Sequence, residues 1–86
     1  MSADNRPDRN SCEYAQERTI LAATEEVSLA MERRGVNKVQ LATRIESSKS
    51  HVTQLLSGSR NMTIRTLAEL AYQLGCTVTI KLEDRK

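Results

Sequence analysis

The sequence contains no phenylalanine or tryptophan and only two tyrosines, Tyr14 and Tyr72. A core without these large rings is built from Leu, Ile, Val, Met and Ala, and a chain of 86 residues has room for only one such core. Because that core is thin, we expect the chain to gain stability by pairing with a second copy of itself. The shortage of aromatic rings also removes the stacking platform by which many proteins bind single-stranded nucleic acids.

Metal-binding and catalytic patterns are missing too. The chain has one histidine, His51, and two cysteines, Cys12 and Cys76, which lie far apart in the sequence. A structural zinc site needs four closely grouped ligands, so we expect no metal ion and no other cofactor. No serine, cysteine or aspartate pattern around His51 suggests a catalytic triad, so we predict no catalytic residues and no enzymatic activity. The two cysteines are expected to be free thiols in a reducing compartment.

Long apolar runs are also absent. No run approaches the ~20 residues that a membrane helix needs. The first ten residues are polar and charged, which is unlike a signal peptide. We therefore expect no membrane association and a cytoplasmic location.

The net charge of +2 is distributed unevenly along the chain. Residues 1–35 carry five basic and seven acidic side chains, whereas residues 36–66 carry five basic side chains against Glu46 alone, a net charge of +4. From residue 67 onward, three basic and three acidic side chains cancel. A basic middle third favours contact with a polyanion such as nucleic acid.

The spacing of apolar residues predicts a long helical region after a polar start. Residues 1–12 are expected to form a flexible N-terminal arm. From Glu13 to Arg34, apolar residues recur at steps of three and four, which indicates an amphipathic helix closed by Gly35. The pattern leaves open whether this region is one helix or two. Its expected core residues are Ile20, Ala23, Val27, Ala30 and Met31.

Two short helices are predicted next, separated by the turn residues 46–48. Asn37 is suited to cap the first helix, over residues 38–45, and Ser48 is suited to cap the second, over residues 49–56. The expected core residues are Val39, Ala42 and Ile45, flanked by Leu41, in the first helix, and Val52, Leu55 and Leu56 in the second. Two short helices joined by such a turn form the helix-turn-helix used by many DNA-binding proteins.

A fourth helix is predicted after its cap Thr63. Its expected core residues are Ile64, Leu67, Leu70, Ala71 and Leu74. Beyond it the period changes to two, because Val78, Ile80 and Leu82 alternate with polar side chains, which indicates a half-buried β-strand. The chain offers this strand no partner, and a lone strand leaves its backbone groups unpaired. We therefore predict that two copies of the chain pair through these three residues.

The second short helix exposes only side chains that can form hydrogen bonds. The residues facing away from its apolar side are Lys49, Ser50, Thr53 and, obliquely, His51 and Gln54. No carboxylate stands among them, although a surface helix commonly includes Glu or Asp. Such a helix can enter the major groove of DNA, which is roughly 12 Å wide. The pattern predicts a face that binds double-stranded DNA.

The run from Asn37 to Gly75 resembles the phage repressor and Cro type of helix-turn-helix, the XRE family. The positions that match the family's pattern are Leu41-Ala42, Ser48, Val52, Gly58, Leu67 and Leu74-Gly75. Three residues depart from it. Lys38 stands where the family has glutamine, Glu46 replaces the glycine of the turn, and Ser47 replaces a half-buried apolar residue. Because glycine tolerates backbone conformations that glutamate resists, either the backbone at Glu46 is strained or the turn differs.

The resemblance implies a lambda-repressor-like, all-α domain of four to five helices with a short C-terminal β-strand. It also implies which residues touch DNA. Base-edge contacts fall to Lys49, Ser50, Thr53 and Gln54, with His51 beside them, and contacts to phosphate or to the groove edge fall to Lys38, Arg60 and Asn61. By side-chain geometry, Gln54 suits adenine and Lys49 suits guanine.

The predicted organisation is a flexible arm (1–12), a helix-turn-helix domain (13–76) and a C-terminal dimerisation strand and tail (77–86). The expected function is a sequence-specific, double-stranded DNA-binding transcriptional regulator, a repressor that acts as a homodimer. Two alternatives stay open: an antitoxin that represses its own operon and holds a toxin protein, and an interaction adaptor that has lost DNA binding. The exposed face of residues 49–54, free of acidic groups, favours DNA over the adaptor.

Overall fold

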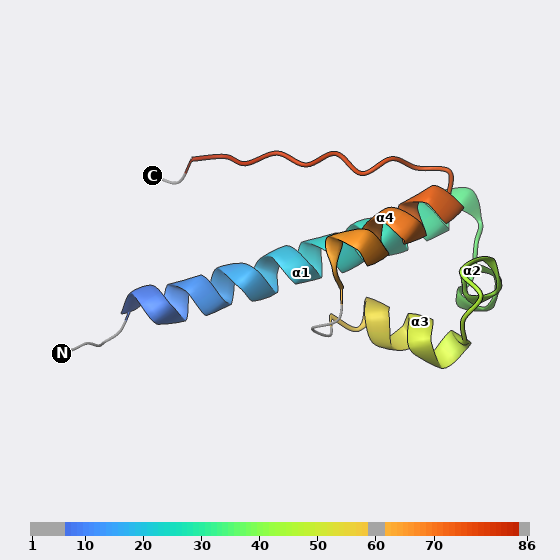
Figure 1. The fold of residues 1–86 in the computed structure, drawn as a ribbon, viewed down its shortest axis with the longest axis horizontal. Helices are drawn as coiled ribbons and strands as arrows, with labels where there is room; N and C mark the ends of the chain where they lie inside the picture. The colour runs from blue at the N-terminus through green and yellow to red at the C-terminus, as the bar shows by residue number, and fades with distance from the viewer. Residues whose placement is uncertain (1–6, 59–61, 85–86) are drawn as a thin grey trace.

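A computed structural model of the protein describes residues 7–58 and 62–84. The helices in this part of the chain are α1 (Pro7–Arg34), α2 (Lys38–Arg44), α3 (Lys49–Leu56) and α4 (Ile64–Gln73) (Figure 1). α2 packs on α3, both α3 and α4 pack on α1, and α2 also contacts α4. The predicted all-α class is confirmed.

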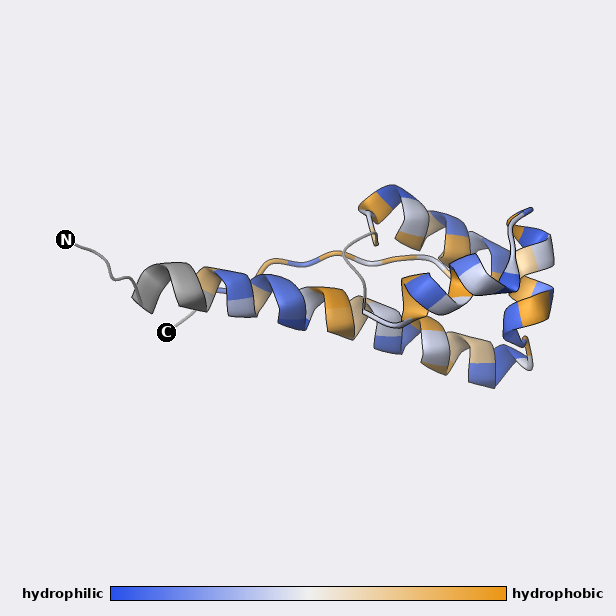
Figure 2. Ribbon diagram, turned by 90° about the horizontal axis from the view of Figure 1, so that it is seen from below, coloured by the Kyte–Doolittle hydropathy of each residue, from blue (hydrophilic) through white to orange (hydrophobic). Residues whose placement is uncertain are grey.

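α1 is one continuous helix of 28 residues, which settles the question that the sequence pattern left open. It begins at Pro7, so residues 7–12 are helical where a flexible arm was predicted, and residues 1–6 of that arm lie outside the described residues. Proline is well suited to the first turn of a helix, because the N–H group that it lacks would have no partner there. The outer part of α1 projects beyond the other helices (Figure 1), and its side chains from Cys12 to Thr19 are exposed. On the side that Figure 2 shows, hydrophilic and hydrophobic residues are mixed along this projection.

The core lies where the four helices meet. Its fully buried centre has one side chain from each of the three shorter helices, Leu41, Val52 and Leu70. The buried residues around this centre are Val27, Ala30, Met31, Val36, Ala42, Leu55 and Leu74. All of them are aliphatic or methionine, as the lack of aromatic residues requires.

Two predicted core positions are wrong. Val39 is 56% exposed and Ile64 is 69% exposed, whereas Leu41, expected only to flank the core, is fully buried. α2 is only seven residues long, about two turns, so the spacing of its apolar residues is compatible with more than one buried face. The neighbouring helices decide which of these faces is buried. Ile64 is the first residue of α4, one turn before the helix reaches the core.

The predicted C-terminal strand is also corrected. No strand occurs among the described residues, and residues 76–84, here named the C-terminal segment, run without regular structure along the side of α1 and α4 (Figure 1). The start of the segment is held in place: the guanidinium of Arg34 donates to the carbonyl of Gly75 at 3.1 Å, and the N–H of Cys76 donates to the carbonyl of Ala71 at 2.7 Å. Beyond Cys76, no backbone group of the described segment is hydrogen-bonded within the described chain. A strand is defined by a paired neighbour, and one chain does not supply that neighbour.

Candidate nucleic-acid interface

α2 begins at a capping box. The side-chain oxygen of Asn37 accepts from the N–H of Gln40 at 2.8 Å, and the side-chain oxygen of Gln40 accepts from the N–H of Asn37 at 2.9 Å. The predicted cap at Asn37 is therefore confirmed, and Gln40 is a partner that the sequence analysis missed. The signal was present, because a capping residue followed three positions later by Gln or Glu is typical of a helix start. Lys38, the first residue of α2, is half-buried.

The turn between α2 and α3 contains a strained residue. Glu46 has a φ of +56°, the one positive φ of a non-glycine residue among the described positions. The turn is held by the N–H of Glu46 donating to the carbonyl of Thr43 at 3.1 Å and by the N–H of Ser47 donating to the carbonyl of Ala42 at 2.8 Å. The first of the two outcomes expected from the missing glycine is thus observed: the turn is retained and the backbone is strained. A left-handed conformation costs a residue with a Cβ roughly 1–2 kcal/mol.

Glu46→Gly is expected to stabilise the domain by about 1 kcal/mol, because glycine adopts positive φ freely and loses part of this gain as chain entropy. In a domain of this size that raises the melting temperature by roughly 4–8 °C. Thermal unfolding followed by circular dichroism measures the effect. Ser47→Gly is the matched control, since Ser47 is also exposed and its φ is not positive, and it should be neutral or destabilising. A Glu46→Gly protein that melts at or below the wild-type temperature would contradict the assigned strain.

α3 is anchored by its cap and by two buried side chains. Ser48 caps the helix as predicted, its hydroxyl oxygen accepting from the N–H of His51 at 3.1 Å. Val52 and Leu55 are buried, which fixes the rotation of α3 about its axis. The opposite side of the helix therefore faces solvent.

The exposed side of α3 brings four predicted contact residues together. Lys49, Ser50, Thr53 and Gln54 line a shallow hollow of about 400 Å³. His51 is exposed at the edge of this group, outside the hollow. The hydroxyls, the amide and the ammonium offer donors and acceptors over two turns of helix, and α3 carries no acidic side chain. Such a surface suits the edges of base pairs in a major groove.

The other residues predicted to contact phosphate, and a further basic residue of the middle third, do not lie on α3. Arg60 and Asn61 lie outside the described residues. Arg44 donates from Nη1 to the carbonyl of Gln73 at 2.8 Å, so it ties α2 to the last turn of α4. The local sequence pattern carries no signal for this contact, and from the sequence Arg44 was counted only as a positive charge.

The described part of the chain contains no group of His, Cys, Asp and Glu side chains suited to a metal ion. Its helices also include none that combines the length and the hydropathy needed to span a bilayer. Cys12 and Cys76 are free thiols, as predicted.

Comparison with known proteins agrees with this geometry. The family model described as helix-turn-helix matches residues 27–80, which include the last two turns of α1, all of α2–α4 and the first part of the C-terminal segment. Comparison with curated proteins gives no significant match. Comparison with solved structures gives none either. The match extends over more than half of the 86 residues, and the chain therefore belongs to the XRE type of the helix-turn-helix family, the DNA-binding transcription regulators.

Proposed function

We propose that this protein is a homodimeric repressor that reads an imperfect palindrome in duplex DNA, with α3 as its recognition helix. The observation that carries the proposal is the hollow on α3, where four polar side chains meet and no carboxylate stands among them. A dimer would place two such helices on half-sites one helical turn, about 34 Å, apart. Occupying the groove excludes other proteins from the same base pairs, so repression needs no further activity from the chain.

The proposed contacts divide into two kinds. Gln54 and Lys49 reach base edges, where a bidentate amide suits adenine and an ammonium suits guanine. Ser50 and Thr53 line the hollow together with these two residues, and His51 at its edge completes the base-reading set. Lys38, Arg60 and Asn61 grip the phosphate backbone or the groove edge, and such contacts set position without carrying sequence information.

The proposed dimer uses the C-terminal segment. Its backbone groups beyond Cys76 are unpaired within the described chain. Val78 is half-buried, whereas Ile80 and Leu82 are 63% and 94% exposed, a costly arrangement for a free surface segment. Antiparallel pairing with the same segment of a second copy would satisfy the backbone groups and cover these side chains at once.

Two substitutions test the division between base and phosphate contacts. Gln54→Ala is expected to reduce the preference for the operator over an unrelated duplex by about 1–3 kcal/mol, because it removes a base contact. Lys38→Ala is expected to weaken both duplexes by the same factor, because it removes a phosphate contact. Fluorescence anisotropy with each labelled duplex measures both effects.

The operator for this test is selected from random duplexes by the wild-type protein. If Gln54→Ala weakened both duplexes equally, or if Lys38→Ala removed the preference, the assigned roles would be wrong. Circular dichroism of both variants checks that the helices remain.

A further inference from the structure

The last turn of α3 is held from its C-terminal end. Ser57 donates to the carbonyl of Gln54 from its N–H at 3.3 Å and from its hydroxyl at 2.7 Å. Gly58 follows with a φ of +82°, a left-handed conformation that glycine adopts at little cost. Gln54 is the residue proposed to meet adenine, so a movement of Gly58 would pass through Ser57 to the backbone that carries this base contact.

A side chain of α1 packs on this end of α3. A Cβ placed on Gly58 would lie 3.1 Å from Cδ1 of Leu21, so a methyl group of the leucine lies directly over the glycine. Among the described residues, no other heavy atom beyond the two chain neighbours comes within 4 Å of that position. The backbone of Leu21 is itself held, because the hydroxyl of the buried Thr24 donates to its carbonyl at 2.8 Å. The contact therefore connects α1 with the turn that ends α3.

Leu21 lies outside the part of α1 that the family model matches. The match begins at residue 27, whereas α1 begins at Pro7. The matched region thus contains Gly58 but not the residue that packs on it. The outer part of α1 projects beyond the other helices (Figure 1), and Leu21 is where this helix reaches the end of α3. The last turn of α3 is therefore supported by a part of the chain that the match does not include.

We infer that Leu21 is a positioning residue for DNA recognition: by packing on Gly58 it fixes the last turn of α3, and so the direction in which Gln54 meets a base pair. The inference rests on the proposed function, in which α3 is the recognition helix, and adds to it a residue of α1 that acts without touching DNA. A bidentate amide discriminates between bases only when its geometry is held, so a support behind the helix contributes to sequence preference.

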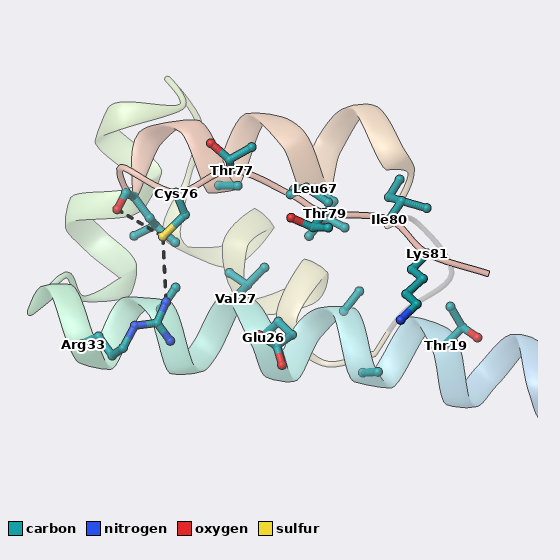
Figure 3. Close-up of a pocket in the computed structure, with 16 residues that line it drawn as sticks. Thr19, Glu26, Val27, Arg33, Leu67, Cys76, Thr77, Thr79, Ile80 and Lys81 are labelled. Carbon is teal, nitrogen blue, oxygen red and sulfur yellow. Dashed lines mark hydrogen bonds between the residues drawn. The ribbon is translucent and has the colours of Figure 1, made fainter. Parts of the chain in front are cut away.

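The contact with Gly58 is separate from the other surface that α1 offers. α1, α4 and the C-terminal segment border a groove, which is lined on the α1 side by residues that include Val27, Glu26 and Arg33 (Figure 3). Leu21 is not among the described residues that line this groove. A shorter side chain at position 21 therefore opens space over Gly58 and leaves the lining of the groove unchanged.

Substitutions of two leucines test the inference. Leu21→Ala removes the contact with Gly58, and Leu29→Ala is its matched control, because the two leucines are 50% and 49% exposed on the same helix and neither lines the groove. Fluorescence anisotropy compares the selected operator with the same duplex changed at the base pair where Gln54→Ala loses its preference. Leu21→Ala is expected to lower this preference about fivefold, part of what one bidentate base contact supplies, and Leu29→Ala less than about twofold. Leu21→Met is expected to restore most of it, because methionine is close to leucine in volume.

A double substitution separates positioning from a general loss of stability. If Leu21 acts through Gln54, adding Leu21→Ala to Gln54→Ala changes the preference no further, because the base contact is already gone. Circular dichroism checks that each variant keeps its helices. If Leu21→Ala keeps the wild-type preference, or loses no more than Leu29→Ala, or adds its full effect to that of Gln54→Ala, the inference is wrong and the proposed function stands. If wild type prefers no duplex, the proposed function and the inference are both wrong.

Discussion

Replacing Thr53 with glutamate is expected to abolish DNA binding while the domain stays folded. Thr53 is exposed and lines the hollow on α3 together with Lys49, Ser50 and Gln54. A carboxylate there would face phosphates and the acceptor-rich edges of base pairs inside a groove, and like charges brought together at an interface cost several kcal/mol. The affinity for any duplex should fall by about 100-fold or more. Glutamate is at least as favourable as threonine in a helix, so the fold should not suffer.

Gln16→Glu is the matched control for this prediction. Gln16 is exposed on the projecting part of α1, so its substitution adds the same single negative charge away from α3. It should change DNA affinity by less than about threefold at moderate salt, because a distant surface charge is screened. A Thr53→Glu protein that binds like wild type, or a control that loses as much affinity, would show that the hollow on α3 is not the contact surface.

DNA affinity is also expected to fall steeply as salt rises. Lys38 and Arg60, the two basic residues assigned to phosphates in each protomer, give about four phosphate contacts in a dimer, and thus a slope of about −3.6 in log affinity against log salt. A rise from 50 to 200 mM salt then lowers the affinity about 100-fold. The modest net charge of +2 does not argue against this, because the charge is concentrated in residues 36–66.

The helix starts show how far local sequence signals reach. Asn37, Ser48 and Thr63 were each predicted as caps, and each accepts the backbone hydrogen bond that a cap requires. These contacts join residues three positions apart, so the sequence contains both partners side by side. The same holds for the exposed side of α3, whose rotation follows from the spacing of Val52 and Leu55.

Features that depend on distant partners could not be predicted in this way. Either Val39 or Leu41 could face the core by the spacing within α2. The neighbouring helices bury Leu41 and leave Val39 exposed. Arg44 bonds to a carbonyl 29 residues away, and Arg34 bonds to one 41 residues away. No local pattern marks such pairs.

The C-terminal segment is the clearest example of a feature that the sequence of one chain cannot predict. Its alternation of Val78, Ile80 and Leu82 with polar residues is a property of the sequence, but a β-strand is a property of two paired segments. In the described part of one chain, the backbone of the segment is unpaired beyond Cys76. A strand would form there only if the segment paired with the same segment of a second copy, as in the proposed dimer. The strain at Glu46, by contrast, was foreseeable, because the resemblance places a glycine at that position and a glutamate stands there.

The most direct test of the central claim, that α3 reads duplex DNA in a sequence-specific way, is fluorescence anisotropy with the wild-type protein. A labelled duplex from upstream of its own gene and an unrelated duplex of the same length would be titrated at 50 and 200 mM salt. We expect binding to the first duplex to be at least about 1,000-fold tighter than to the second at the higher salt, with both weakened by rising salt. No binding to either duplex at 50 mM salt, or equal binding to both at each salt concentration, would contradict the claim.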